Sequence, residues 1–341
     1  MDIPMLLEIP AAIVPDRTAV ADDERSLTYG ELAASANAVA ERRVAAGVEP
    51  GAHVIVLGVN TVGFVAALFG IAAAGCVAVP VNYRVREDEL TYLLQDSGAA
   101  AVLTQPRYRE LAEAAGADLV LDLEEASTPA ADADGELHRL RDLDYDAVAV
   151  ILYTSGTTAA PKGVMLGHAG LAQYVMLGRD APDGSDAGSS VLAAPLYHVA
   201  GITALLNALY VGRTTYLMPR FEPADWLDLV EARAVTHAFV VPTMRARIID
   251  DEAFGLSAPE LGQALKREGI DTRRYYWPPI HMQKAYADSP RERDLPITER
   301  VAGSVLTPPL YSHMTEDEAR RVARSIAAVQ ANASLVRSAL G

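Results

Sequence analysis

Residues 54–83 carry no charged side chain, and this stretch constrains the fold more than any other part of the chain. Its length would suit a membrane span, but Asn60, Pro80, Asn82 and several glycines interrupt it. Buried strands of parallel sheets are near-continuous apolar runs of this kind. The stretch therefore predicts three buried elements: a strand at 53–58, a helix at 61–74 and a strand at 77–81.

Strand-like and helix-like segments go on alternating up to residue 241, and this pattern predicts an α/β fold with a mostly parallel sheet. Further strands are expected at 100–103, 118–121, 147–153, 190–194, 214–218 and 237–241. Helices are expected at 29–46, 87–96, 107–115, 168–178, 198–210, 223–233 and 260–268, and from a capping box at Thr315 to about residue 331. The acidic residues 122–146 predict an exposed connection.

Net charge and cysteine content limit the partners and the cellular compartment that can be expected for this chain. The 341 residues carry a net charge of −16, which argues against nucleic acid as a partner because nucleic-acid binding needs a basic surface. The single cysteine, Cys76, excludes an internal disulfide and is expected to be a small buried apolar residue. Reduced cysteine and an N-terminus without the basic region of a secretion signal predict a cytoplasmic protein. No contact with a membrane is expected.

The run 153–164 is the strongest sign of function. It combines a row of hydroxyl donors, glycines that allow close backbone approach, and Lys162, one of only three lysines in the chain. The residues expected to bind phosphate are Thr154, Ser155, Gly156, Thr157, Thr158, Lys162 and Gly163. A strand before this loop and a helix from His168 after it would aim amide groups at an anion. The plain alternative is a Ser/Thr-rich surface turn with a solvated lysine.

The run 153–166 resembles the signature loop of the adenylate-forming superfamily, which includes acyl-CoA synthetases, luciferases and peptide-synthetase adenylation domains. Other stretches resemble that family in the same order along the chain: Leu27–Leu32, Gly47–Gly51, Val79–Asn82, Pro195–Gly201 and Val240–Met244. The resemblance covers about residues 10–250. It implies the N-terminal portion of the family's large domain.

The resemblance implies a ligase that binds ATP, activates a carboxylic acid as an acyl adenylate and passes the acyl group to coenzyme A or a carrier protein. Lys162 would bind the β and γ phosphates as a catalytic residue, and His198 would line the acyl pocket beside Tyr197 and Gly201. A hydrogen-bonded core or capping histidine is the plain alternative for His198.

Two positions depart from the family, which has glycine where Ala159 stands and a hydroxyl residue where Gly167 stands. The motifs with which the family binds Mg²⁺ and ribose, and its lid lysine, are not found, because the pattern ends near residue 250. Mg²⁺ is therefore implied by the resemblance although its usual ligands are absent, and the activity could be impaired.

Residues 246–330 resemble a second family, the C-terminal small domain of DegT/DnrJ/EryC1/StrS sugar aminotransferases. The similar stretches are Gly269–Pro279, His281–Tyr286 and Leu306–Ser312. Pyridoxal phosphate is not expected, since neither Lys266 nor Lys284 lies in that family's cofactor motif. The two resemblances predict an adenylate-forming domain at 1–250 and a small α+β domain at 251–341, joined within 245–254.

Three functions stay open at this point. The first is an acyl-CoA-synthetase-like enzyme that binds a nucleotide and a carboxylic acid. The second is a non-catalytic hybrid or interaction module, of which an oligomer formed through the C-terminal segment is one form. The third, with the least support, is a sugar aminotransferase.

Overall fold

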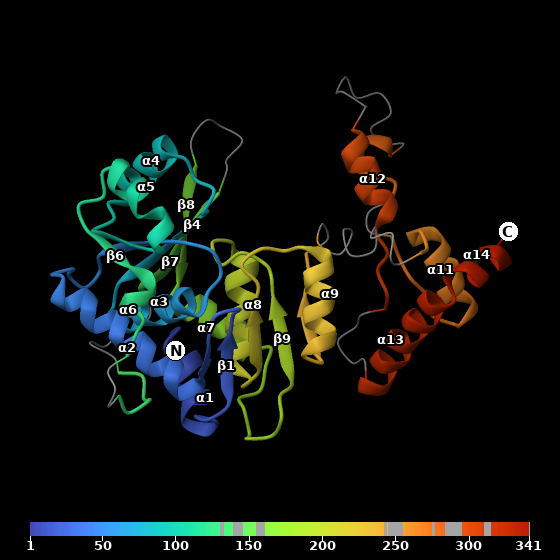
Figure 1. The fold of residues 1–341 in the computed structure, drawn as a ribbon, viewed down its shortest axis with the longest axis horizontal. Helices are drawn as coiled ribbons and strands as arrows, with labels where there is room; N and C mark the ends of the chain where they lie inside the picture. Colours follow the sequence, from blue (N-terminus) through green and yellow to red (C-terminus); the bar gives the residue numbers. More distant parts are fainter. Residues whose placement is uncertain are drawn as a thin grey trace. The chain divides into compact units, whose positions relative to one another are not determined.

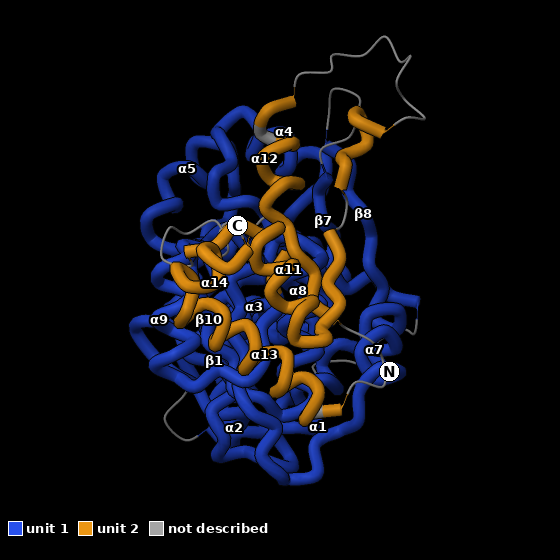
Figure 2. Tube along the Cα trace, turned by 90° about the vertical axis from the view of Figure 1, so that its right-hand side faces the viewer, with its two compact units in different colours: residues 1–239 blue, residues 240–341 orange. Residues whose placement is uncertain are grey.

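A computed structural model describes residues 1–129, 133–138, 146–154, 161–241, 244, 255–274, 277–283, 295–309 and 315–340. The chain divides into two compact units, residues 1–239 and 240–341 (Figures 1 and 2). The first unit contains every strand of the described residues, and the second is built from helices and one isolated antiparallel bridge between Arg273 and Thr307.

A six-stranded sheet in the order β6-β5-β3-β4-β7-β8 forms one half of the first unit. Its strands are β3 (His53–Leu57), β4 (Val77–Val81), β5 (Ala101–Thr104), β6 (Val120–Asp122), β7 (Val148–Thr154) and β8 (Lys162–Gly167). Five of them run parallel, and β8 pairs antiparallel with β7. The predicted strands at 53–58, 77–81, 100–103, 118–121 and 147–153 are therefore confirmed within a residue or two at each end.

Side chains on β3 show why this half of the unit is apolar throughout. Val54 and Val56 join one hydrophobic core, while Ile55 and Leu57 join a second core on the opposite face of the sheet. Successive side chains of a strand point to opposite faces, so a sheet covered on both sides needs apolar residues at every position. The helices that contribute to the cover are α2 (Tyr29–Ala45) and α3 (Val62–Ala73) on one face, and α4 (Glu87–Ser97) and α5 (Arg109–Ala114) on the other.

A five-stranded sheet in the order β11-β9-β10-β1-β2 forms the other half of the first unit. Its strands are β1 (Thr18–Ala21), β2 (Ser26–Thr28), β9 (Ser189–Leu192), β10 (Thr214–Leu217) and β11 (His237–Phe239). Helices α1 (Met5–Ile13), α7 (His168–Met176), α8 (Val199–Tyr210) and α9 (Pro223–Ala232) belong to this half. The larger core joins side chains of both sheets with α1, α2, α3 and α8.

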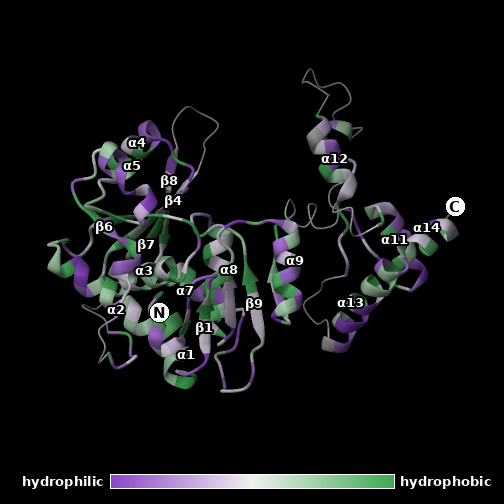
Figure 3. Cartoon of the chain, in the orientation of Figure 1, coloured by the Kyte–Doolittle hydropathy of each residue, from purple (hydrophilic) through white to green (hydrophobic). Residues whose placement is uncertain are grey.

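The remaining elements are short or lie in the second unit. They are a 3₁₀ turn at Pro106–Tyr108, α6 (Leu123–Ala126), α11 (Ala258–Arg267), a 3₁₀ turn at Ile280–Met282, α12 (Pro296–Ser304), α13 (Glu316–Ala331) and α14 (Ala333–Leu340). The predicted capping box is present, since Thr315 accepts from the amide of Glu318 and the Glu318 carboxylate accepts from the Thr315 amide. No described helix has the length and apolarity that a membrane crossing would require. Figure 3 shows apolar residues gathered in the interior of the first unit.

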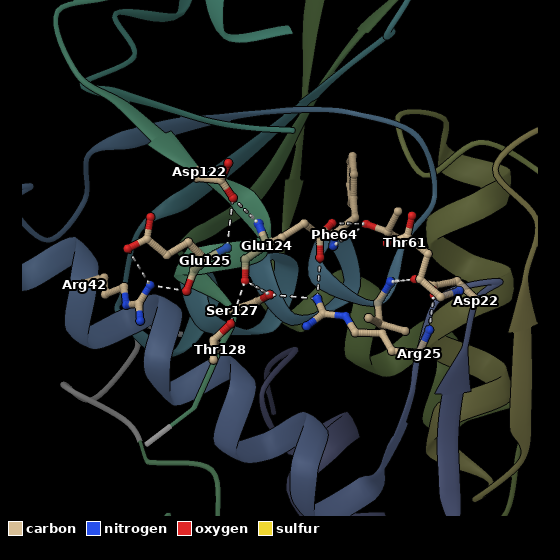
Figure 4. Close-up of polar contacts among 12 residues, drawn as sticks. Asp22, Arg25, Arg42, Thr61, Phe64, Asp122, Glu124, Glu125, Ser127 and Thr128 are labelled. Atoms are coloured by element: carbon tan, nitrogen blue, oxygen red, sulfur yellow. Dashed lines mark hydrogen bonds and ion pairs between the residues drawn. The ribbon is translucent and has the colours of Figure 1, made fainter. Parts of the chain in front are cut away.

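The acidic connection at 122–146 is only partly as predicted. Leu123 and Ala126 of α6 are buried in the core, and the Arg25 guanidinium pairs with the Glu124 carboxylate. Glu124 also accepts a hydrogen bond of 3.0 Å from Thr61, at the start of α3, and Figure 4 shows this cluster. The described part of the connection is therefore packed against the domain. A four-residue helix with two acidic side chains gives too weak a period to be seen in the sequence.

Elements that the sequence analysis missed are α1, β1, β2, α6, β8, α12 and α14. Strands β1 and β2 are four and three residues long, and α1 contains Pro10. Prolines and very short strands both weaken sequence patterns. The predicted junction at 245–254 lies entirely outside the described residues.

Helix α4 is attached to both strands of the β7–β8 pair by hydroxyl groups. The Tyr153 hydroxyl, on β7, donates to the Asp96 carboxylate at 2.6 Å. The Tyr92 hydroxyl lies 3.1 Å from the carbonyl oxygen of Pro161, the residue before β8. Burial, together with Asp96, raises the pKa of Tyr153 well above its ordinary value. The neutral phenol is thus the form that the folded chain stabilises.

Replacing Gly70 tests the packing of α2 against α3. A Cβ at Gly70 would lie 2.7 Å from the Val39 Cβ and would overlap the Ala36 carbonyl oxygen, so Gly70→Ala must push the helices apart. We expect it to lower the free energy of unfolding by about 1–3 kcal/mol in urea. Gly170→Ala in α7 is the matched control, because no atom lies within 4 Å of its Cβ position. A control loss as large as that at Gly70 would contradict the packing argument.

Replacing Tyr153 with phenylalanine tests the bond to Asp96. We expect the free energy of unfolding at pH 8 to fall by about 1 kcal/mol. The folded pKa is raised, so the contribution is complete below the unfolded tyrosine pKa of about 10 and is lost as pH rises above it. Urea unfolding should therefore show that the difference in the free energy of unfolding between wild type and variant is smaller at pH 10.5 than at pH 8. Tyr174→Phe, at an exposed position, serves as the control, and a difference that grows with pH would contradict the assignment.

Candidate functional site

Strands β7 and β8 bring together the two ends of the predicted phosphate loop. Thr154, the last residue of β7, is the register partner of Lys162, the first residue of β8. Directly opposed residues of an antiparallel pair have Cα atoms about 4.5–5.5 Å apart. Five of the predicted loop residues lie at 154–158, and of these only Thr154 falls within the described residues; Ser155, Gly156, Thr157, Thr158 and the divergent Ala159 fall outside them.

The structure differs from the predicted strand–loop–helix order. A strand, β8, follows the loop, and α7 begins only at His168. The predicted helix start at His168 is confirmed, but the strand between the loop and this helix was not predicted. The hydroxyl that the family has before the histidine would stand at Gly167, which is the N-cap of α7 and provides no side-chain cap.

Gly163 has a packing role in addition to the one predicted. A Cβ there would lie 2.9 Å from Ile151 Cγ2 and 3.4 Å from the Tyr153 ring, so a larger residue would disturb the cross-strand contact. Lys162 is exposed, as a lysine that meets a soluble anion must be. The hairpin thus presents the ammonium group beside Thr154 with no side chain at the next position.

A pocket of about 730 Å³ lies at the carboxyl ends of β4 and β7. Thr154, Tyr197 and His198 line it, which unites three residues that the sequence analysis selected from two motifs. Lys162 does not line this pocket, although its neighbour Pro161 does. Ligands of parallel α/β sheets bind at the carboxyl ends of the strands, and a pocket of this size can hold a small organic ligand.

His198 occupies the N-cap of α8, where its Nδ1 accepts a hydrogen bond of 3.2 Å from the Ala200 amide. His198 is thus a capping histidine that also lines the pocket, and its predicted contact with an acyl group stays a prediction. Gly201 does not line the pocket. It lies in the first turn of α8 against the Pro195 carbonyl group, where a Cβ would overlap the oxygen, so its predicted place in the pocket wall is wrong.

Tyr197 and Arg84 line the pocket, and Tyr83 and Arg220 lie beside these residues without lining it. The rings of Tyr83 and Tyr197 meet edge to face with centroids 6.1 Å apart. The Arg84 and Arg220 guanidinium groups lie 5.3 and 5.8 Å from the Tyr83 centroid. Burial raises the pKa of Tyr197, and nearby Tyr83 adds to this shift while Arg84 opposes it. The phenol of Tyr197 is therefore a neutral hydrogen-bonding group at physiological pH.

Sequence reasoning missed the arginines of this site. Arg84 follows the stretch Val79–Asn82 by two residues, so extending that stretch would have found it. Arg84 carries no ion pair among the described residues, whereas Arg86 lies 3.6 Å from both Asp88 and Glu89. Arg84 is thus a cation at the pocket without a neutralising partner in the described part of the chain.

The chain is similar in sequence to a family of known enzymes. The sequence model of the AMP-binding enzyme family matches residues 7–323. The feruloyl-CoA synthase of Amycolatopsis sp is 36% identical over 237 residues, which are 69% of this chain and 47% of that protein. The 2-succinylbenzoate–CoA ligase of Bacillus subtilis is 29% identical, over 71% of this chain and 49% of that protein. The chain thus spans about half the length of these curated relatives.

Solved structures give the same result for the fold. The inhibitor-bound N-terminal domain of FACL13 from Mycobacterium tuberculosis superposes with a TM-score of 0.66 at 26% identity, covering 75% of this chain and 66% of that one. O-succinylbenzoate coenzyme A synthetase from Bacillus subtilis in complex with AMP gives a TM-score of 0.63 at 28% identity, covering 72% of this chain and 64% of that one. The predicted α/β fold of the large domain is therefore confirmed.

The comparisons give no support to the predicted aminotransferase part. The family match runs through residue 323 and so crosses most of the segment 246–330 on which that resemblance was based. The family model covers most of the chain, the curated relatives and solved structures agree with it, and the chain belongs to the AMP-binding enzyme family.

Proposed function

We propose that the chain binds ATP at the β7–β8 hairpin and takes part in activating a carboxylic acid as an acyl adenylate. The observation that carries the proposal is the register pairing of Lys162 with Thr154, a residue that lines the same pocket as Tyr197 and His198. This pairing supports a loop whose hydroxyl and amide donors face the phosphates, closed at its end by a positive charge.

Each residue has a proposed part in the reaction. The hydroxyl groups of the loop would donate to phosphate oxygens, and the Lys162 ammonium would bind the β and γ phosphates. A carboxylate that attacks the α phosphorus brings two anions together, so positive groups must offset their repulsion. Arg84 is a second cation at the pocket. His198 would border the acid, because it holds the N-terminus of α8 at the pocket wall.

Magnesium belongs to the chemistry that the family implies, but the described residues do not form a protein site for it. Nowhere in the described part of the chain do three histidine, cysteine, aspartate or glutamate side chains gather as metal ligands. We therefore assign no residue to Mg²⁺. The ion commonly binds through the phosphates of the nucleotide with few protein ligands.

The acid and the acceptor are proposed from the relatives. One is called a feruloyl-CoA synthase and another a 2-succinylbenzoate–CoA ligase, names that state aromatic acids and coenzyme A. The Tyr197 ring in the pocket lining supports an aromatic acid for this chain too, since contact between aromatic rings stabilises such ligands. Coenzyme A or a carrier thiol would be the acceptor.

Calorimetric titration of Mg-ATP tests the nucleotide site. We expect saturable binding by the wild type and binding at least about tenfold weaker for Lys162→Ala, because a charge-assisted contact contributes about 1.5–3 kcal/mol. Lys266→Ala, an exposed lysine on α11, is the matched control and should bind as the wild type does. Equal affinities for all three proteins would mean that Lys162 does not touch the nucleotide.

Carboxylate-dependent exchange between ATP and pyrophosphate tests the activation step. We expect exchange above background with at least one acid of a panel that begins with aromatic acids, and loss of that exchange in Lys162→Ala. Saturable ATP binding without exchange for any acid would favour the alternative of a non-catalytic nucleotide-binding module.

A further inference from the structure

A second pocket, of about 350 Å³, lies on the five-stranded sheet, away from the β7–β8 hairpin. Its lining comes from β9, β10, β11, α7 and α8, with Arg179 from the segment after α7 and Arg213 from the residue before β10. Arg179, Arg213 and His237 line it, and none of its lining residues is an aspartate or a glutamate. The two positive charges of this pocket therefore have no negative counterpart among its lining residues.

Arg213 is held in place by acceptors on two sides. Its Nε donates to the Ala187 carbonyl oxygen at 3.0 Å, and one terminal nitrogen, Nη2, lies 2.9 Å from His237 Nε2. Its other terminal nitrogen, Nη1, makes no hydrogen bond within the described part of the chain. The guanidinium group is therefore fixed in the pocket with donors left over.

The hydrogen bonds around His237 assign its tautomer. A guanidinium group only donates, so Nε2 must accept from Arg213 and carry no proton. Nδ1 then carries the proton and donates to Thr236 Oγ1 at 2.9 Å, while that hydroxyl donates to the Ser189 carbonyl oxygen at 3.0 Å. His237 is thus neutral and positions Arg213.

The charges agree with this arrangement. Burial, and then the neighbouring Arg213 and Arg179, lower the pKa of His237. Burial, and then Arg179, lower the pKa of Arg213. The two guanidinium groups are therefore close enough to repel each other, and a bound anion would remove that repulsion.

The rest of the lining is mainly apolar or neutral, and includes Tyr174, Leu192 and Phe239. Ser190 and Thr215 share a hydrogen bond of 3.1 Å with each other at the sheet surface. An inorganic ion would leave the apolar side chains in contact with water, whereas an organic anion would cover them.

We propose that this pocket binds a small organic anion, with a carboxylate or phosphate group on Arg179 and Arg213 and an apolar body against Leu192 and Phe239. The site is distinct from the nucleotide site proposed above and does not depend on it. Carboxylate and phosphate share the recognition by guanidinium groups, so the test compares them directly.

Ligand-observed NMR on the full chain provides the test, with benzoate, phenyl phosphate, neutral benzamide and inorganic phosphate as probes. We expect benzoate or phenyl phosphate to bind at least about tenfold more tightly than benzamide, the difference that one charge-assisted contact makes. Whichever of the two anions binds more tightly shows whether the site prefers a carboxylate or a phosphate group. Inorganic phosphate should bind more weakly than phenyl phosphate, and equal affinity would overturn the role of the apolar side chains.

Variants locate the binding. Arg179→Met changes an exposed side chain that makes no ion pair among the described residues, so its fold should be intact, and Arg213→Met removes the positioned group. Both substitutions should lower the affinity for the anionic probe about tenfold. The matched control is Arg233→Met, whose guanidinium lies over the Tyr216 ring 5.4 Å from its centroid and outside this pocket. Lys162→Ala should leave binding unchanged. Retained binding in both pocket variants, or loss in Lys162→Ala, would overturn the proposal.

Discussion

The antiparallel pairing of β7 with β8 is the constraint on which the site depends. It turns the chain back on itself at the carboxyl end of a parallel sheet, so that Thr154 and Lys162 face each other at the two ends of one loop. Without this pairing, nothing would hold the backbone of Thr154 next to that of Lys162. The Tyr153 hydroxyl of β7 donates to Asp96 of α4, and the Tyr92 hydroxyl of α4 donates to the Pro161 carbonyl oxygen just before β8, so α4 holds the hairpin against the domain. The sheet therefore fixes the positions of Thr154 and Lys162, the residues at the two ends of the loop.

That sheet in turn depends on being covered on both faces. The alternation of Val54 and Val56 with Ile55 and Leu57 between two separate cores explains why the segment carries no charge at all. The close approach of α2 and α3 at Gly70 belongs to the same packing. A stiff scaffold with apolar faces leaves its polar chemistry to the strand ends, where both proposed sites are found.

Much of the first unit could be predicted from the sequence, because long apolar runs separated by amphipathic helices specify a parallel α/β fold. The phosphate loop was visible for a different reason, since hydroxyl residues, glycines and a rare lysine stand close together in the chain. Strand β8 was not predicted, because its six residues have no clear period of two and its pairing is set by β7. The pocket beside Tyr83 and the cluster at Arg213 arise from residues far apart in sequence, and only the folded chain brings them together. The aminotransferase resemblance of the second unit shows the opposite error, in which short similar stretches were given too much weight.

Hydrogen–deuterium exchange of the full chain with and without Mg-ATP tests the central claim most directly. The account predicts that ATP slows exchange in the hairpin segment 153–167 and in the pocket segments 82–93 and 197–201, and leaves α11 and α13 unchanged. Slower exchange confined to other segments, or no change at ATP concentrations that saturate binding, would contradict the assignment of this hairpin as the nucleotide site.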